Sequence, residues 1–191
     1  MVIVEKPVIA LGQTYFAYQT RKQEILEKQY KELTEDEKRI NIRNKIREGN
    51  LGLNKTAVAS GVKNLGEFHN AGYKGLYNGE TADDIFKRKG LRYREDILDN
   101  MGSEELGSNL FRITQADAKL KREEVDNEYT ANSTLYEEGK KVRNTIKELG
   151  GTMPEDLPTP NKSIKEIEKE TNKIEIKEKN KNDSSNVIKK G

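Results

Sequence analysis

The sequence predicts a mainly α-helical fold, an irregular bundle of several helices with a glycine- and tyrosine-rich loop, a proline strap and a charged C-terminal tail. Three observations support this fold class. Apolar residues recur at helical spacing through most of the chain. Helix-start residues such as Thr34, Thr81 and Ser103 precede several of these stretches, and glycines follow them. Strand signals are confined to residues 2–4 and 8–11.

The N-terminal third predicts three helices. A first helix begins near Gln13 and carries one apolar face, formed by Ala17, Ile25, Leu26, Tyr30 and Leu33. Thr34 and Glu37 have the spacing of a capping box, which opens a second helix. We expect this second helix to stop at Gly49 and a short third helix to cover residues 54–60, with Gly61 just beyond its end.

The run His69–Gly90, HNAGYKGLYNGETADDIFKRKG, concentrates glycines, two tyrosines and the only histidine of the chain. Glycine at this density is typical of backbone that needs positive φ or a close approach. Thr81 is a suitable N-cap for a helix over 82–89 that ends on basic residues, as the helix dipole favours. The run therefore predicts an aromatic, glycine-rich loop that leads into a short basic helix and serves as a recognition element.

Helices also dominate the rest of the chain. A short one is expected over 94–101, closed by Gly102, and Ser103 should cap a long one that reaches Leu120. A further helix over 126–149 would end at Gly150-Gly151 and bury four apolar residues, Leu135, Val142, Ile146 and Leu149.

The C-terminal part differs in composition. Residues 152–160 hold three of the four prolines, so we expect a stiff, non-helical strap. Residues 162–179 predict a charged helix whose thin apolar stripe docks on the body or on a partner. From Asn180 onward the composition is that of a disordered tail.

Composition limits the possible functions. Only 32% of residues are hydrophobic, and the chain has four Phe and no Trp, so a large compact enzyme is not expected. The absence of cysteine excludes disulfides and thiolate metal sites. The longest apolar run, Val8–Leu11, is too short to span a bilayer, and no secretory signal is recognisable, so a cytoplasmic protein is expected. With a single imidazole, His69, and no catalytic constellation, we expect no enzyme, cofactor or metal.

Charge is distributed unevenly along the chain. From Lys162 onward nine lysines face six acidic residues, so residues 1–161 hold 26 basic and 27 acidic side chains. A body this balanced does not coat DNA in general, and any contact with nucleic acid must come from a local patch. One such patch places five basic residues in eight positions: Lys87, Arg88, Lys89, Arg92 and Arg94.

Two interpretations of this patch are open. The helices Ala82–Lys89 and Glu95–Met101 have the spacing of a helix-turn-helix, whose basic residues would contact phosphates. Alternatively, the patch is a solvated helix end followed by an ordinary corner between helices. Tyr73 and Tyr77 likewise either stack on bases or form a small core within their own loop, and His69 beside Phe68 is more typical of a structural role.

Four segments carry a resemblance to a known family. They cover about half of the chain: PVIALGQTYFAYQTRKQE (Pro7–Glu24), HNAGYKGLYNGETADDIFKRKG, ILDNMGSEELGSNLFRITQADAKL (Ile97–Leu120) and GKKVRNTIKELGGTMPEDLPTPNKSIKEIE (Gly139–Glu168). In these segments the chain resembles the bacterial DNA-damage-inducible protein D family, whose members are similar to phage antirepressors and carry a BRO-type N-terminal domain.

The resemblance implies three parts. Residues 1–12 would be a remnant of the BRO-type region, 13–161 a helical domain like that of the family, and 162–191 a charged helix and disordered tail. The chain is therefore expected to correspond to the C-terminal portion of the family's members.

The resemblance also implies a function. The chain would be a non-enzymatic accessory protein of the SOS response that restrains RecA-type recombinase filaments through protein or DNA contacts. We expect the contact surface to include nine residues: Phe68, His69, Tyr73, Tyr77, Lys87, Arg88, Lys89, Arg92 and Arg94. The alternative is an antirepressor-like DNA-binding protein that uses residues 82–101. A hydrolase or nuclease, which would need clustered carboxylates that bind Mg²⁺, is a weaker third hypothesis. The long helices also suit a homodimer.

Overall fold

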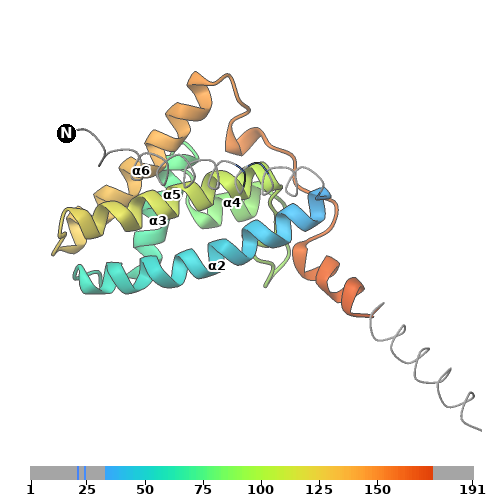
Figure 1. The fold of residues 1–191 in the computed structure, drawn as a ribbon, viewed down its shortest axis with the longest axis horizontal. Coiled ribbons are helices and arrows are strands. Elements are labelled where there is room, and N and C mark those ends of the chain that lie inside the picture. The colour runs from blue at the N-terminus through green and yellow to red at the C-terminus, as the bar shows by residue number, and fades with distance from the viewer. Residues whose placement is uncertain (1–20, 22–23, 25–32, 174–191) are drawn as a thin grey trace, which may run out of the picture.

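The computed structural model describes Arg21, Glu24 and the continuous stretch 33–173 (Figure 1). Apart from Arg21, Glu24 and Leu33, the helix predicted from Gln13 lies outside the described residues, as do the strand signals near the N-terminus and the tail from Asn180. Within the described part, helices α2, α3, α5 and α6 form the body and no strand is present, which confirms the mainly α prediction. No helix in this part is long and apolar enough to cross a membrane.

Helix α2 (Glu35–Ala59) begins at the predicted capping box, in which Thr34 Oγ1 accepts from the Glu37 amide and the Glu37 carboxylate accepts from the Thr34 amide. The predicted stop at Gly49 is wrong, and the second and third predicted helices are one. Burial explains the difference, since the helix packs along α5 (Ser103–Arg122) and Leu53 and Ala57, beyond Gly49, are fully buried. Tertiary packing outweighs the weak helix propensity of glycine.

The end of α2 follows the prediction. Gly61 has φ +83°, and the amides of Gly61 and Val62 donate to the carbonyls of Val58 and Ala57. This is a Schellman arrangement, which suits glycine because the left-handed conformation strains other residues.

The predicted glycine-rich loop is wrong over its first half. Residues Leu65–Leu76 form helix α3, which crosses α6 (Glu128–Glu148) in close contact. A Cβ on Gly75 would collide with the Tyr136 carbonyl oxygen, and one on Gly139 would lie 2.6 Å from the Gly72 carbonyl oxygen. Gly72 and Gly75 of this run therefore allow two helix backbones to touch, and positive φ within the run is confined to the turn at Asn78 and Gly79 and to Gly90 at its end.

Helix α4 (Ala82–Arg88) has the predicted start, a capping box between Thr81 and Asp84. The helix predicted over 94–101 does not form: this segment contains only the 3-10 turn η1 (Leu98–Asn100). The Arg92 amide donates to the Glu95 carboxylate, and the Leu98 amide donates to the Asp96 carboxylate. Local hydrogen bonds of this kind compete with helix formation. Without a second helix, residues 82–101 are not a helix-turn-helix.

Two long helices complete the body. Gly102, rather than Ser103, is the N-cap of α5, while Ser103 bonds through its amide and hydroxyl to the Glu35 carboxylate at the start of α2. Helix α6 ends at Glu148, and the predicted glycine just beyond its C-cap, Gly150, has φ +71°. Leu135 and Val142 are buried as expected, but Leu149 is 81% exposed because it lies just past the last helical residue.

The proline strap packs on the body and contains one short 3-10 turn, η2 (Pro154–Asp156). Arg143 of α6 makes a bidentate ion pair with Glu155, at 2.7 and 2.6 Å, and Arg88 donates to the Glu155 carbonyl. A further helix, hereafter the 164–173 helix, begins at Ile164 and includes the last described residue. Its first residue, Ile164, is only 2% exposed, so the helix docks on the body.

The contact between the backbones of α3 and α6 predicts that alanine substitutions at two helical glycines change stability in opposite directions. Gly75→Ala should lower the free energy of unfolding by about 2–3 kcal/mol, because a methyl group there forces α3 and α6 apart. Gly107→Ala on α5 meets no atom within 4 Å and should raise it by up to about 1 kcal/mol. Urea denaturation followed by circular dichroism measures both. If both substitutions changed the free energy of unfolding equally, the inference that α3 and α6 touch at Gly75 would be wrong.

Candidate nucleic-acid interface

A polar groove of about 600 Å³ opens where α2, the segment 92–100 and the 164–173 helix meet. Its basic residues outnumber its acidic ones by six to four. The basic residues are Arg43, Arg47, Arg92, Arg94, Lys165 and Lys169, and the acidic ones are Glu95, Asp96, Asp99 and Glu166. We call this site the basic groove.

The acidic residues of the basic groove serve the local structure. Arg43 donates to Asp99 at 2.8 Å and to Asp96 at 3.0 Å. The Glu95 carboxylate accepts hydrogen bonds from the guanidinium and from the backbone amide of Arg92. Glu166 accepts from Ser163 at the start of the 164–173 helix, and these bonds lower the pKa of its carboxyl group.

Four cations of the basic groove therefore form no ion pair within 4 Å with another described residue. They are Arg47, Arg94, Lys165 and Lys169, and all four are exposed. Unpaired, exposed cations that converge on one groove are the electrostatic feature with which proteins bind phosphates.

Tyr93 adds an aromatic surface to this charge. Its side chain is 85% exposed, and the guanidinium carbon of Arg94 lies 5.3 Å from its ring centroid. An exposed ring beside cations can stack on an unpaired base while the cations hold the backbone.

The groove is assembled by a buried arginine, Arg39 of α2. Its side chain is 2% exposed and donates to three carbonyls: Met101 at 2.9 Å, Asp99 at 3.1 Å and Lys162 at 2.9 Å. Met101 and Asp99 belong to the segment around η1, and Lys162 lies two residues before the first residue of the 164–173 helix. A single guanidinium thus fixes the three walls of the groove relative to one another.

The predicted basic patch does not act as one surface. Arg92 and Arg94 line the basic groove, whereas Lys87 is exposed on α4 and outside it. Arg88 bonds to Glu80 and to the Glu155 carbonyl, which anchors the proline strap. Lys89 is buried.

Lys89 belongs to a buried polar network. Its ammonium lies 2.8 Å from the carboxylate of Glu105, and both side chains are fully buried. Tyr77 donates to the same carboxylate at 3.1 Å and accepts from Asn109 at 2.7 Å. Burial raises the pKa of the Tyr77 hydroxyl well above its ordinary value. These groups stabilise the interior and are not available to a partner in this conformation.

The aromatic residues of the predicted recognition element are buried as well. Phe68 and Tyr77 are 0% exposed and Tyr73 is 8% exposed. The expected exposure is wrong because the run containing them is a helix packed on α5 and α6. Arg112 of α5 lies over Tyr73, at 4.8 Å from the ring centroid, in the space that the missing side chain of Gly72 leaves.

His69 joins two helices. Its Nε2 lies 2.7 Å from Asn54 Oδ1 on α2, and its ring meets Phe68 edge-on. Burial, together with the charge of Arg112, lowers the pKa of His69 to about 4, so the imidazole is neutral at pH 7. This geometry agrees with a structural role. The part of the chain that the structure describes contains no cluster of three acidic or imidazole side chains suited to a metal ion.

Sequence analysis missed most of the groove: Arg43, Arg47, Tyr93, Lys165 and Lys169. Arg43 and Arg47 are four residues apart, as are Lys165 and Lys169. This spacing places the two members of each pair on one face of a helix. That signal was present in the sequence. Nothing in the sequence indicated that these faces of α2 and of the 164–173 helix meet across residues 92–100.

The neutral state of His69 predicts a pH dependence of stability. Since the folded-state pKa of about 4 lies below the ordinary value of 6.5, the unfolded chain binds the proton more tightly, and stability is lost as the pH falls between these values. From about pH 7.5 to about pH 5 this loss is about 2 kcal/mol in free energy of unfolding. His69→Gln, which keeps a hydrogen-bonding side chain but does not titrate, should remove that part of the pH dependence in urea titrations. An unchanged pH dependence in this variant would show that His69 is not the group responsible.

Residues 33–167 match the family model described as the DinD C-terminal domain. Over 178 residues the chain is 52% identical to DNA damage-inducible protein D of Escherichia coli (strain K12), an alignment that covers 91% of this chain and 64% of that protein's length. No solved structure matches. The resemblance that the sequence motifs indicated is confirmed, and the chain belongs to the DinD C-terminal domain family.

Proposed function

We propose that this chain is a non-enzymatic module of the DNA-damage response that restrains a RecA-type recombinase filament by binding it through the basic groove. The membership of the DinD family supports a role in this response, as does the printed name of the relative, DNA damage-inducible protein D. Because the chain spans 64% of that relative's length, this activity is our proposal for the present chain.

The observation that carries the proposal is the set of unpaired cations beside Tyr93. Four such cations share one groove in a body that has nearly equal numbers of basic and acidic residues. A nucleoprotein filament presents phosphates and bases, which these side chains are suited to contact. Neither side-chain burial nor internal ion pairs prevent Arg47, Arg94, Lys165 and Lys169 from making such contacts.

Filament is a better partner for this groove than bare DNA. With four unpaired cations, neutralisation of phosphates alone gives weak binding at physiological salt, and each single-strand phosphate contact contributes a slope of only about 0.7 in the salt dependence. Contacts with the recombinase would add affinity that does not depend on salt in this way. The helix-turn-helix on which the antirepressor-like alternative relied is absent from the described structure. Dimerisation through the long helices stays a prediction.

The proposal predicts a charge-reversal effect. Arg94→Glu combined with Lys165→Glu should weaken binding to a recombinase filament at least tenfold, because both cations would become repulsive to phosphate. The control is Lys55→Glu, which reverses an exposed lysine of α2 outside the basic groove and should bind as the unmodified chain does. Fluorescence anisotropy with a labelled single-stranded oligonucleotide, bare or coated with a RecA-type recombinase, measures the affinity at about 50 and about 150 mM salt.

Three results would contradict the proposal. Unchanged filament binding by the double variant would exclude the basic groove as the contact. Equal affinity of the unmodified chain for bare and coated oligonucleotide would indicate DNA binding that does not require the recombinase. No binding to the filament under either salt condition would show that this chain does not act on it.

A further inference from the structure

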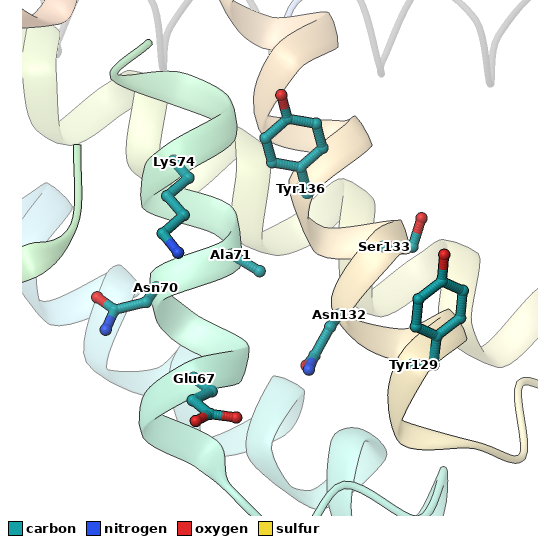
Figure 2. Close-up of a pocket in the computed structure, with 8 residues that line it drawn as sticks. All are labelled: Glu67, Asn70, Ala71, Lys74, Tyr129, Asn132, Ser133 and Tyr136. Carbon is teal, nitrogen blue, oxygen red and sulfur yellow. The ribbon is translucent and has the colours of Figure 1, made fainter. Parts of the chain in front are cut away.

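A second groove, of about 410 Å³, lies between α3 and α6 (Figure 2). Tyr129 and Tyr136 of α6 stand on one side, Glu67 and Lys74 of α3 on the other, and Asn132 lies between the helices. We call this site the tyrosine groove. None of its lining residues belongs to the basic groove.

The tyrosine groove results from the way the two helices cross. At Gly75 the backbones of α3 and α6 are in contact. Figure 2 shows the two helices close together near Lys74 and Tyr136 and farther apart toward Glu67 and Tyr129. Ala71, one turn before Gly75 on α3, lines the space with the smallest side chain that a chiral residue has. The opening is therefore held in place by the crossing and does not require a conformational change to form.

The two tyrosines form an accessible aromatic wall. They are seven residues apart on α6, which places them two turns apart on one helix face. Tyr129 is 85% exposed and Tyr136 is 37% exposed. Tyrosine supplies large contact area at a small entropic cost, and together with the neighbouring asparagine and serine it is typical of surfaces that bind proteins.

Asn132 stands between the tyrosines and has an unused acceptor. Its Oδ1 is buried and has no hydrogen-bond partner in the described structure. A buried acceptor without a donor is unfavourable in the free chain. A backbone amide that enters the groove, with rotation of the Asn132 side chain toward it, would satisfy this oxygen.

The charges of the tyrosine groove distinguish it from the basic groove. The two charged residues that line the tyrosine groove are Glu67 and Lys74. They are two turns apart on α3 and do not form an ion pair with each other. One cation accompanied by one anion does not attract a polyphosphate. It is complementary to a protein segment that carries an acidic and a basic side chain in the opposite order.

We infer that the tyrosine groove binds a protein segment of the recombinase, one that places an apolar side chain against Tyr129 and Tyr136, donates a backbone amide to Asn132 and pairs with Glu67 and Lys74. This inference rests on the proposed function. It divides the contacts with the filament between two surfaces: the basic groove takes the nucleic acid and the tyrosine groove takes the protein.

The test uses the anisotropy measurement described above, with the full chain and a recombinase-coated oligonucleotide. Tyr129→Ala combined with Tyr136→Ala should weaken filament binding at least tenfold while leaving its salt dependence unchanged, because no phosphate contact is lost. A second variant, Glu67→Lys with Lys74→Glu, reverses the order of the charges without changing the net charge and should also weaken binding. The control is Phe111→Ala, which removes a half-exposed ring of α5 outside both grooves and should have no effect. Circular dichroism on all variants establishes that each is folded.

Each result decides between the two proposals. If both tyrosine-groove variants bind filament normally while Arg94→Glu with Lys165→Glu does not, the proposed function stands and the inference is wrong. If loss of the tyrosines weakens binding to bare oligonucleotide and lowers the salt slope, the groove binds nucleic acid, which also overturns the inference. If the unmodified chain does not bind the filament, both proposals fail.

Discussion

The basic groove depends on one buried guanidinium, that of Arg39. Three carbonyls from two distant segments accept its hydrogen bonds, and its remaining nitrogen pairs with Asp36. Hydrogen bonds to charged groups are among the stronger ones in proteins, and the planar fork of arginine holds several acceptors in a fixed geometry. The segment around η1 lacks regular structure over most of its length, so its position next to α2 relies on contacts of this kind and on the pairs of Arg43 with Asp96 and Asp99.

A different constraint governs the other half of the molecule. The α3–α6 crossing brings backbones together at Gly75 and Gly139, and Gly72 leaves room for the side chain of Arg112. Burial lowers the pKa of Arg112, which has Tyr73 beneath it and donates a hydrogen bond to Asn109 but pairs with no carboxylate of the described residues. Neighbouring groups of the interior, Tyr77, Lys89 and Glu105, satisfy one another instead of facing a ligand. The most conspicuous run of the sequence is therefore the centre of the fold.

The basic groove and the tyrosine groove have different chemistry. The basic groove has four cations that form no ion pair among residues 33–173 and an exposed tyrosine, a combination suited to phosphates and bases. The tyrosine groove has balanced charge, two accessible rings and a buried acceptor, a combination suited to a polypeptide. The nucleoprotein filament that we propose as the partner would offer a matching surface to each groove.

Sequence alone determined the features that depend on neighbouring residues. The capping boxes at Thr34 and Thr81 and the helix ends at Gly61 and Gly150 were predictable because their hydrogen bonds close within a few residues. Tertiary structure decided which glycines end helices and which permit contact, as Gly49 and Gly75 show. It also decided that Lys89 is buried while Arg94 is exposed, although both belong to the same basic run. The reason is physical: burial, the pairing of charges and the space at a glycine are set by whichever distant element packs against a residue, and local sequence does not encode that partner.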